Sequence, residues 1–177
     1  MLRMILNLIR RLLHMLAFMG PGGGSLRPWL HRLRGAHVEK NVWISHFVYI
    51  DDCHPECVSI GENCTIGLRV TIFAHLYWGP LRHENKGKVI IEKNVFVGPH
   101  CVILPNVRIG EGAVIKAGTV VSRNVPPHTL YGPPSPEVLG EATVPLTAEH
   151  TYEEFVRGMR LRVKPKREPR GTGNELS

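Results

Sequence analysis

The side chains best suited to catalysis lie beside two interruptions of a repeated sequence. His75 comes just before the longer interruption, which contains His83 and Glu84, and Asp51 and Asp52 lie at the shorter one. An imidazole can take a proton from a hydroxyl group near neutral pH, and a second polar side chain can orient it. The arrangement indicates a general base, His75. The alternatives are a surface histidine without a role and, for Asp51 in particular, ordinary turn chemistry.

These residues need a rigid support, and a repeat of six residues predicts one. Large aliphatic side chains recur every sixth position, each preceded two residues earlier by a second small or aliphatic side chain, and glycine often follows. The aliphatic positions are Val38, Ile44, Ile50, Ile60, Ile66, Ile72, Ile91, Val97, Ile103, Ile109, Ile115 and Val121. A period of six fits neither a helix nor a continuous strand, but it fits short strands separated by corners, with the aliphatic side chain inside and glycine at the corner. Three repeats close one triangular coil, so the twelve repeats predict four stacked coils.

Different segments flank the repeats. Residues 1–19 are predicted to form an amphipathic helix with arginines on one face, and residues 21–25 are Pro/Gly-rich and predict a hinge. The helix either lies on a membrane surface or closes one end of the domain. Thr151 and Glu154 predict a capping box for a helix that ends near Val163, before a charged, disordered tail. The expected organisation is 1–35 helix and hinge, 36–136 repeat domain, and 137–177 C-terminal helix and tail.

Composition narrows the function classes. The formal net charge is +7, and its positive surplus lies in residues 1–40 and 157–177, whereas residues 41–156 are mildly acidic. This distribution suggests an anionic partner of the termini, such as a lipid surface, and argues against nucleic acid. The four cysteines form no CxxC pair, and Cys64 and Cys101 fall at inward positions, so we expect reduced thiols and a cytoplasmic location. If the first helix binds lipid, the protein is expected at the inner face of the membrane as a peripheral protein. Cys53-His54-x-x-Cys57 lacks a partner pair, and no metal is expected.

The repeat region resembles the hexapeptide-repeat acyltransferases, in particular the maltose- and galactoside-acetyltransferase-like enzymes. Residues 25–35 resemble the lead-in of colanic-acid-type acetyltransferases. The segments that carry the resemblance within residues 36–136 are residues 49–52, 70–75, 94–107 and 115–126. This resemblance implies an all-β fold, a left-handed parallel β-helix, that assembles into a homotrimer with active sites between subunits. It also implies acetyl transfer from acetyl-CoA to a hydroxyl of a sugar or glycan, as in polysaccharide biosynthesis.

The resemblance assigns roles to individual residues. It implies that His75 is the catalytic base and that the loop after it contacts the acceptor. The candidate acceptor-binding residues are Asp52, Trp78, His83 and Glu84, and the candidate coenzyme-binding residues are Gly98, Ala117, Ser122 and Arg123. Trp78 offers a ring for stacking on a sugar, and Arg123 a guanidinium for a phosphate. Packing within the loop and a solvated basic turn are the respective alternatives.

One segment departs from the family. Residues 132–137 stand where the family has Gly-Asn-Pro-Ala-Lys, and Glu137 replaces a basic residue, which affects the contacts expected for the donor. Two other functions fit a solenoid of this kind. One is a non-catalytic scaffold or binding module. The other is a zinc enzyme similar to the β-helix carbonic anhydrases, which needs a histidine pair that the sequence after His100 does not provide.

Overall fold

The computed structural model of the chain describes residues 2–75, 87–135 and 137–161, with the backbone alone for residues 2–7 and 161. Contacts divide the chain into two units, residues 1–133 and 134–177, which are described separately below. The first unit contains the N-terminal helices and all the six-residue repeats. The acceptor-loop candidates Trp78, His83 and Glu84 lie outside the described residues.

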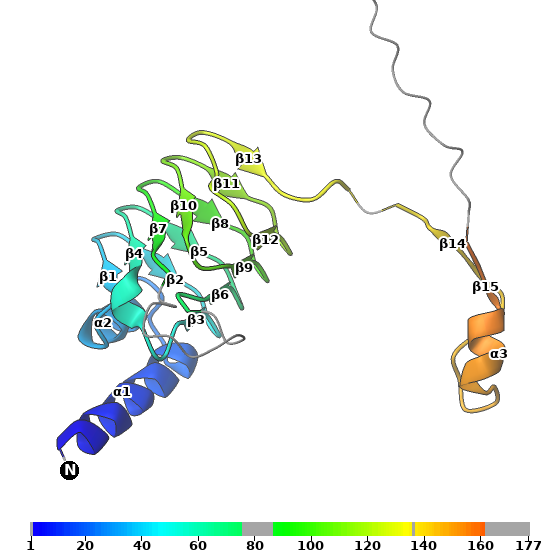
Figure 1. Cartoon of the computed structure of the whole chain (residues 1–177), viewed down its shortest axis with the longest axis horizontal. Helices are drawn as coiled ribbons and strands as arrows, with labels where there is room; N and C mark the ends of the chain where they lie inside the picture. The colour runs from blue at the N-terminus through cyan, green and yellow to red at the C-terminus, as the bar shows by residue number, and fades with distance from the viewer. Residues whose placement is uncertain (1, 76–86, 136, 162–177) are drawn as a thin grey trace, which may run out of the picture. The chain divides into compact units, whose positions relative to one another are not determined.

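The repeats form a parallel β-helix with three flat walls (Figure 1). The first sheet contains β1 (His37–Val38), β4 (Val58–Ile60), β7 (Val89–Ile91) and β10 (Val107–Ile109). The second sheet contains β2 (Trp43–Ile44), β5 (Thr65–Ile66), β8 (Phe96–Val97), β11 (Val114–Ile115) and β13 (Leu130–Tyr131). The third sheet contains β3 (Tyr49–Ile50), β6 (Thr71–Ile72), β9 (Val102–Ile103) and β12 (Val120–Val121). The prediction of four left-handed coils is confirmed, and a fifth begins with the bridge of Val125 to Ile109 and continues in β13.

The core of the β-helix is the repeated aliphatic position itself. All twelve predicted aliphatic residues are buried, and register pairs such as Ile50 with Ile72 and Ile72 with Ile103 stack them coil upon coil. The thiols of Cys64 and Cys101 point into the same core and are free. Each six-residue repeat therefore buries two side chains, the aliphatic residue and the one two positions before it, because side chains alternate between the two faces of a short extended wall.

Glycine serves the corners in both of the predicted ways, but at different positions of the repeat. A Cβ atom on Gly98 would lie 2.6 Å from the backbone nitrogen of Ala117 in the next coil, so close approach excludes a side chain there. Positive φ angles fall two residues further along the corner, at Gly112 with φ of 65° and at Asn63 and Asn94 with φ of 58° and 61°. Asparagine tolerates this conformation better than most other side chains do.

Two helices precede the first coil. α1 (Leu2–Met19) is the predicted amphipathic helix, and α2 (Leu26–Leu33) lies in a segment for which no helix was expected. The break between them is anchored, because the carbonyl of Gly23 accepts the N–H of Ile44 and the buried Arg27 donates to the carbonyls of Gly20 and Ile44. Within the described residues, no helix combines the length and the apolar character that crossing a bilayer requires.

The second unit is small. α3 (Tyr152–Arg157) begins with the predicted capping box of Thr151 and Glu154, which is confirmed. The prediction that this helix continues to Val163 is wrong. Gly158 ends it, and β15 (Met159–Leu161) then pairs antiparallel with β14 (Gly140–Ala142). The predicted disordered tail lies in residues outside the described range.

Candidate active site

Both interruptions of the repeat fall at one corner of the β-helix. We call this corner, where the chain leaves the third sheet and returns to the first, the return edge; its described residues are 51–57, 73–75, 87–88, 104–106 and 122–124. Asp51 follows β3, and His75 follows β6 in the next coil. Because Tyr49 and Ile50 pair in register with Thr71 and Ile72, the two insertions begin side by side.

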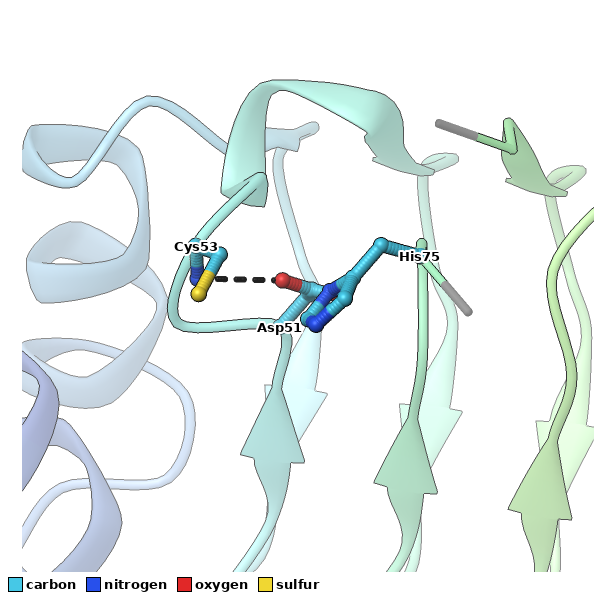
Figure 2. Close-up of side chains that lie close together, drawn as sticks. All are labelled: Asp51, Cys53 and His75. Carbon is cyan, nitrogen blue, oxygen red and sulfur yellow. Dashed lines mark hydrogen bonds and ion pairs between the residues drawn. The ribbon is translucent and has the colours of Figure 1, made fainter. Parts of the chain in front are cut away.

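Asp51 and His75 form a hydrogen-bonded pair at the return edge. Nδ1 of His75 lies 2.6 Å from Oδ2 of Asp51, and Figure 2 shows the imidazole turned toward the carboxylate. The Asp51 side chain is fully buried, whereas that of His75 is 14% exposed. The pair therefore has a buried member that fixes geometry and a member that reaches solvent.

Backbone donors fix the Asp51 carboxylate. Oδ1 accepts the N–H groups of Cys53 and His54 at 3.0 and 2.8 Å, and Oδ2 accepts the N–H of Ala74 at 2.7 Å. The turn chemistry expected of Asp51 is thus present in Oδ1, and Oδ2 adds the contact with His75. A carboxylate that only accepts hydrogen bonds matches the charged form of aspartate.

A buried arginine holds the backbone on which Asp51 lies. The Arg34 guanidinium, 1% exposed, donates to the carbonyls of Ile50 and Asp51 at 3.1 and 2.9 Å and contacts Nδ1 of His31 at 3.0 Å. Burial lowers the pKa of Arg34 to about 10, which leaves it charged at neutral pH. No sequence pattern pointed to this residue. Its contacts arise because α2 closes the open end of the first coil.

The pair is arranged for proton transfer. A hydrogen on Nδ1 that points to Asp51 places the lone pair of the imidazole on Nε2. In that tautomer, Nε2 accepts a proton, and the carboxylate stabilises the imidazolium that results. The geometry is that of a general base with an orienting carboxylate. Sequence reasoning missed the contact between Asp51 and His75. The signal was present, because both insertions follow the third repeat of a coil and so fall at one corner.

The neighbouring Asp52 and Cys53 have different environments. Oδ1 of Asp52 accepts the hydroxyl of Tyr49 at 2.6 Å. Burial acts to raise the pKa of Asp52, but hydrogen bonds from Tyr49 and Cys53 outweigh it and hold that pKa below its usual value. Burial, together with the charge of Asp52, raises the pKa of the Cys53 thiol, which keeps the sulfur protonated.

A metal is a conceivable occupant of this corner, since ligand atoms of Asp51, Cys53 and His75 lie within 4.8 Å of one another. The donor set fits a metal poorly. The short contact between Asp51 and His75 has the length of a hydrogen bond, and both carboxylate oxygens already accept backbone donors. The arrangement favours acid–base chemistry.

The four candidate coenzyme residues lie at two different corners. Gly98 and Ala117 stack in successive coils at the corner between the second and third sheets, where the N–H of Gly98 bonds to the carbonyl of Ile115. Ser122 and Arg123 are exposed on the return edge after β12, two coils beyond β6. The third sheet separates these two pairs within one chain.

Comparison with known proteins agrees with the repeat architecture. The family model described as bacterial transferase hexapeptide (six repeats) matches residues 88–123, and the model described as hexapeptide repeat of succinyl-transferase matches residues 57–74. The Bacillus subtilis (strain 168) protein named "Putative acetyltransferase YvoF" is 42% identical over 111 residues, 61% of this chain and 62% of that protein. The bifunctional protein GlmU of Streptococcus uberis is 29% identical over 130 residues, 67% of this chain but 27% of that protein. The chain thus spans less than two thirds of either curated relative.

Solved structures share the fold. A hexapeptide-repeat-containing acetyltransferase of Vibrio cholerae in complex with acetyl coenzyme A superposes with a TM-score of 0.58 at 21% identity, covering 71% of this chain and 81% of that one. A galactoside acetyltransferase in complex with coenzyme A superposes with a TM-score of 0.50 at 26% identity, covering 69% of this chain and 73% of that one.

Proposed function

We propose that this chain, which belongs to the hexapeptide-repeat transferases, moves an acetyl group from acetyl-CoA to a hydroxyl group of a sugar or glycan. The observation that supports this most directly is the 2.6 Å contact between His75 and the fully buried carboxylate of Asp51. Likeness to a galactoside acetyltransferase bound to coenzyme A supports the donor and the acceptor class.

His75 acts as the base in this reaction. Nε2 takes the proton of the acceptor hydroxyl while that oxygen attacks the carbonyl carbon of the thioester. The carbon–sulfur bond then breaks, and the imidazolium returns the proton to the thiolate of coenzyme A. Asp51 keeps the hydrogen on Nδ1 throughout, so that Nε2 alone exchanges it.

The matched test is His75→Ala against His100→Ala. Both residues belong to the first unit, but His100 is exposed at the corner between the second and third sheets, away from Asp51. Release of free thiol from acetyl-CoA in the presence of sugar acceptors should fall about 10²- to 10⁴-fold in the first variant and remain in the second. Transfer at the wild-type rate by folded His75→Ala would overturn the proposal. A scaffold protein would show no thermal stabilisation by acetyl-CoA.

The proposed assembly is a homotrimer with the donor site between chains. An apolar hollow of about 660 Å³ beside the third sheet supports it, because a neighbouring copy would cover half-buried aromatic side chains there. Its lining residues are Phe18, Phe47, Tyr49, Arg69, Thr71 and Phe73. Light scattering should give three chains. Mixing inactive His75→Ala with an inactive Arg123→Glu variant should restore activity only if sites combine two chains.

We also propose that the protein works in the cytoplasm at the membrane surface. The free cysteines fit a reducing compartment. In α1 and α2, a set of large apolar side chains remains about half exposed: Leu8, Leu12, Met15, Leu16, Met19, Trp29 and Leu33. Such a face, next to a segment with a surplus of arginine, suits insertion into the interface of an anionic bilayer.

A further inference from the structure

A small hollow lies next to the proposed base. Of its lining residues, only Asp52 was a candidate for binding the acceptor, and none was a candidate for binding the coenzyme. It measures about 240 Å³ and is lined by Arg10, Arg11, Asp52 and Cys53. The sulfur of Cys53 is within 4.8 Å of the ligand atoms of His75 and Asp51, so the hollow adjoins the return edge where proton transfer is proposed. Two arginines of α1 therefore come close to an active site that the β-helix builds.

The position of α1 over the coil is fixed by specific contacts. The carbonyl of Phe18 accepts the N–H of Phe47 at 2.9 Å, and the rings of these two residues meet edge to face at 5.5 Å. One turn earlier, the ring of His14 contacts Tyr49 at 5.2 Å. Tyr49 is also the donor to Asp52, so the helix is anchored on the strand, β3, that leads into the return edge.

The arginines do not share the exposed apolar face of α1. At 100° per residue, Leu12, Met15 and Leu16 lie on one side of the helix, and Arg10 lies on the opposite side with the buried Ala17. Arg11 lies at the border between the two faces. The apolar face points away from the β-helix, whereas Arg10 and Arg11 line a hollow shared with it.

The charge in the hollow is not balanced. Among the described residues, no ion pair joins Arg10 or Arg11 to a carboxylate, and the first acidic residue of the chain is Glu39. Asp52 faces the same hollow, but its carboxylate accepts the Tyr49 hydroxyl and supplies one negative charge against two positive ones. Two guanidinium groups that line one hollow suit an anion with several oxygens, such as a phosphate group.

We propose that Arg10 and Arg11 bind a phosphate group of the acceptor, so that the acceptor is a phosphorylated saccharide. This inference rests on the proposed function, because it assigns the acceptor of the same site. The phosphate lies in the hollow and the hydroxyl reaches Nε2 of His75. The acetyl transfer keeps the bonds and the proton path given above, and the phosphate takes no part in them.

The first test measures binding without any reaction. Galactose 1-phosphate and galactose differ only in the phosphate, and their affinities for the full chain are compared by calorimetry in the absence of acetyl-CoA. Galactose 1-phosphate should bind roughly tenfold tighter or more, and Arg10→Gln/Arg11→Gln should abolish the difference. Arg10→Lys/Arg11→Lys should keep most of it, because the charge stays. The control Arg157→Gln/Arg160→Gln removes two exposed arginines of the second unit and should behave like the wild type.

Three outcomes overturn the inference. Equal affinity for the two sugars removes its basis, and an equal loss in both glutamine variants shows that only overall charge matters. If Arg10→Gln/Arg11→Gln loses binding to phosphatidylglycerol vesicles but keeps its preference for galactose 1-phosphate, the arginines serve lipid headgroups. Because binding is read without acetyl-CoA, failure of transfer alone counts against the proposed function and leaves the phosphate site to be judged by affinity.

Discussion

Replacing Asp51 with asparagine changes one atom at the centre of the candidate site. The carboxylate accepts four hydrogen bonds, from Nδ1 of His75 and from the N–H groups of Cys53, His54 and Ala74. Asparagine keeps one accepting oxygen and directs an NH₂ group at the remaining donors. If the amide oxygen stays with the turn, the NH₂ group faces His75 and favours the hydrogen on Nε2, the tautomer that cannot act as base.

The magnitude follows from burial. The buried N–H of Ala74 then faces the NH₂ group instead of an acceptor, and an unsatisfied buried group costs about 1–3 kcal/mol, so the free energy of unfolding should fall by about that amount. The wrong tautomer removes general-base catalysis, which contributes about 10²- to 10⁴-fold to kcat.

The assay is thiol release from acetyl-CoA over a pH series, with urea unfolding of the same samples. Glu62→Gln is the control, because it neutralises a carboxylate of the same β-helix that pairs with Lys40 at the corner after β4, away from His75. Asp51→Asn/His75→Ala should be about as slow as His75→Ala alone, since the two residues act as one unit. A folded Asp51→Asn variant with the wild-type kcat and pH profile would refute the role assigned to this carboxylate.

Three further predictions concern other parts of the molecule. Ile109→Asp places an unpaired carboxylate at a fully buried core position and should abolish the cooperative thermal transition, whereas Val114→Asp on the exposed side of the next strand should keep it; equal behaviour would contradict the stacked core. Burial lowers the pKa of His31 to about 3, so between pH 6.5 and 3 the unfolded chain binds a proton that the folded chain does not. As the pH decreases through this range, the free energy of unfolding should therefore decrease by up to about 1.4 kcal/mol per pH unit. His31→Gln should flatten this slope in urea titrations, and an unchanged slope would exclude His31 as its cause. Leu12→Gln/Leu16→Gln should weaken binding to anionic vesicles without lowering Tm, because both side chains are more than half exposed; unchanged binding would exclude this face of α1.

The repeat made most of the fold predictable. An aliphatic residue that recurs at every sixth position, such as Ile66 or Ile103, is predicted to be buried from its spacing alone. Because each coil contacts only its neighbours, few other topologies are compatible with the repeat. The helix 26–33 escaped prediction because Pro28 and a short, basic segment give a weak periodic signal. The end of α3 was placed too late, because Gly158 and the pairing of β14 with β15 decide it, and strand partners distant in sequence leave no local pattern.

The site was predictable in part. His75 was found from its place before an insertion, and its role remains a prediction. Asp51 looked like a turn residue because its Oδ1 does accept the N–H groups of the turn that follows it. A sequence pattern reveals such local contacts, but it does not reveal the contact of Oδ2 with His75, which is distant in sequence. The candidates Gly98 and Ser122 fall at different corners, which their spacing alone did not reveal.

The amino-acid sequence by itself determined the periodic core, the corners and the number of coils, because these depend on contacts that recur at a fixed interval. The tertiary structure alone decided that Asp51 receives the imidazole of His75, that Arg34 holds the backbone of Asp51, and that Arg10 and Arg11 lie beside them. Those contacts join residues at least 17 positions apart, and only the stacking of coils and the packing of α1 and α2 on the first of them bring such residues together.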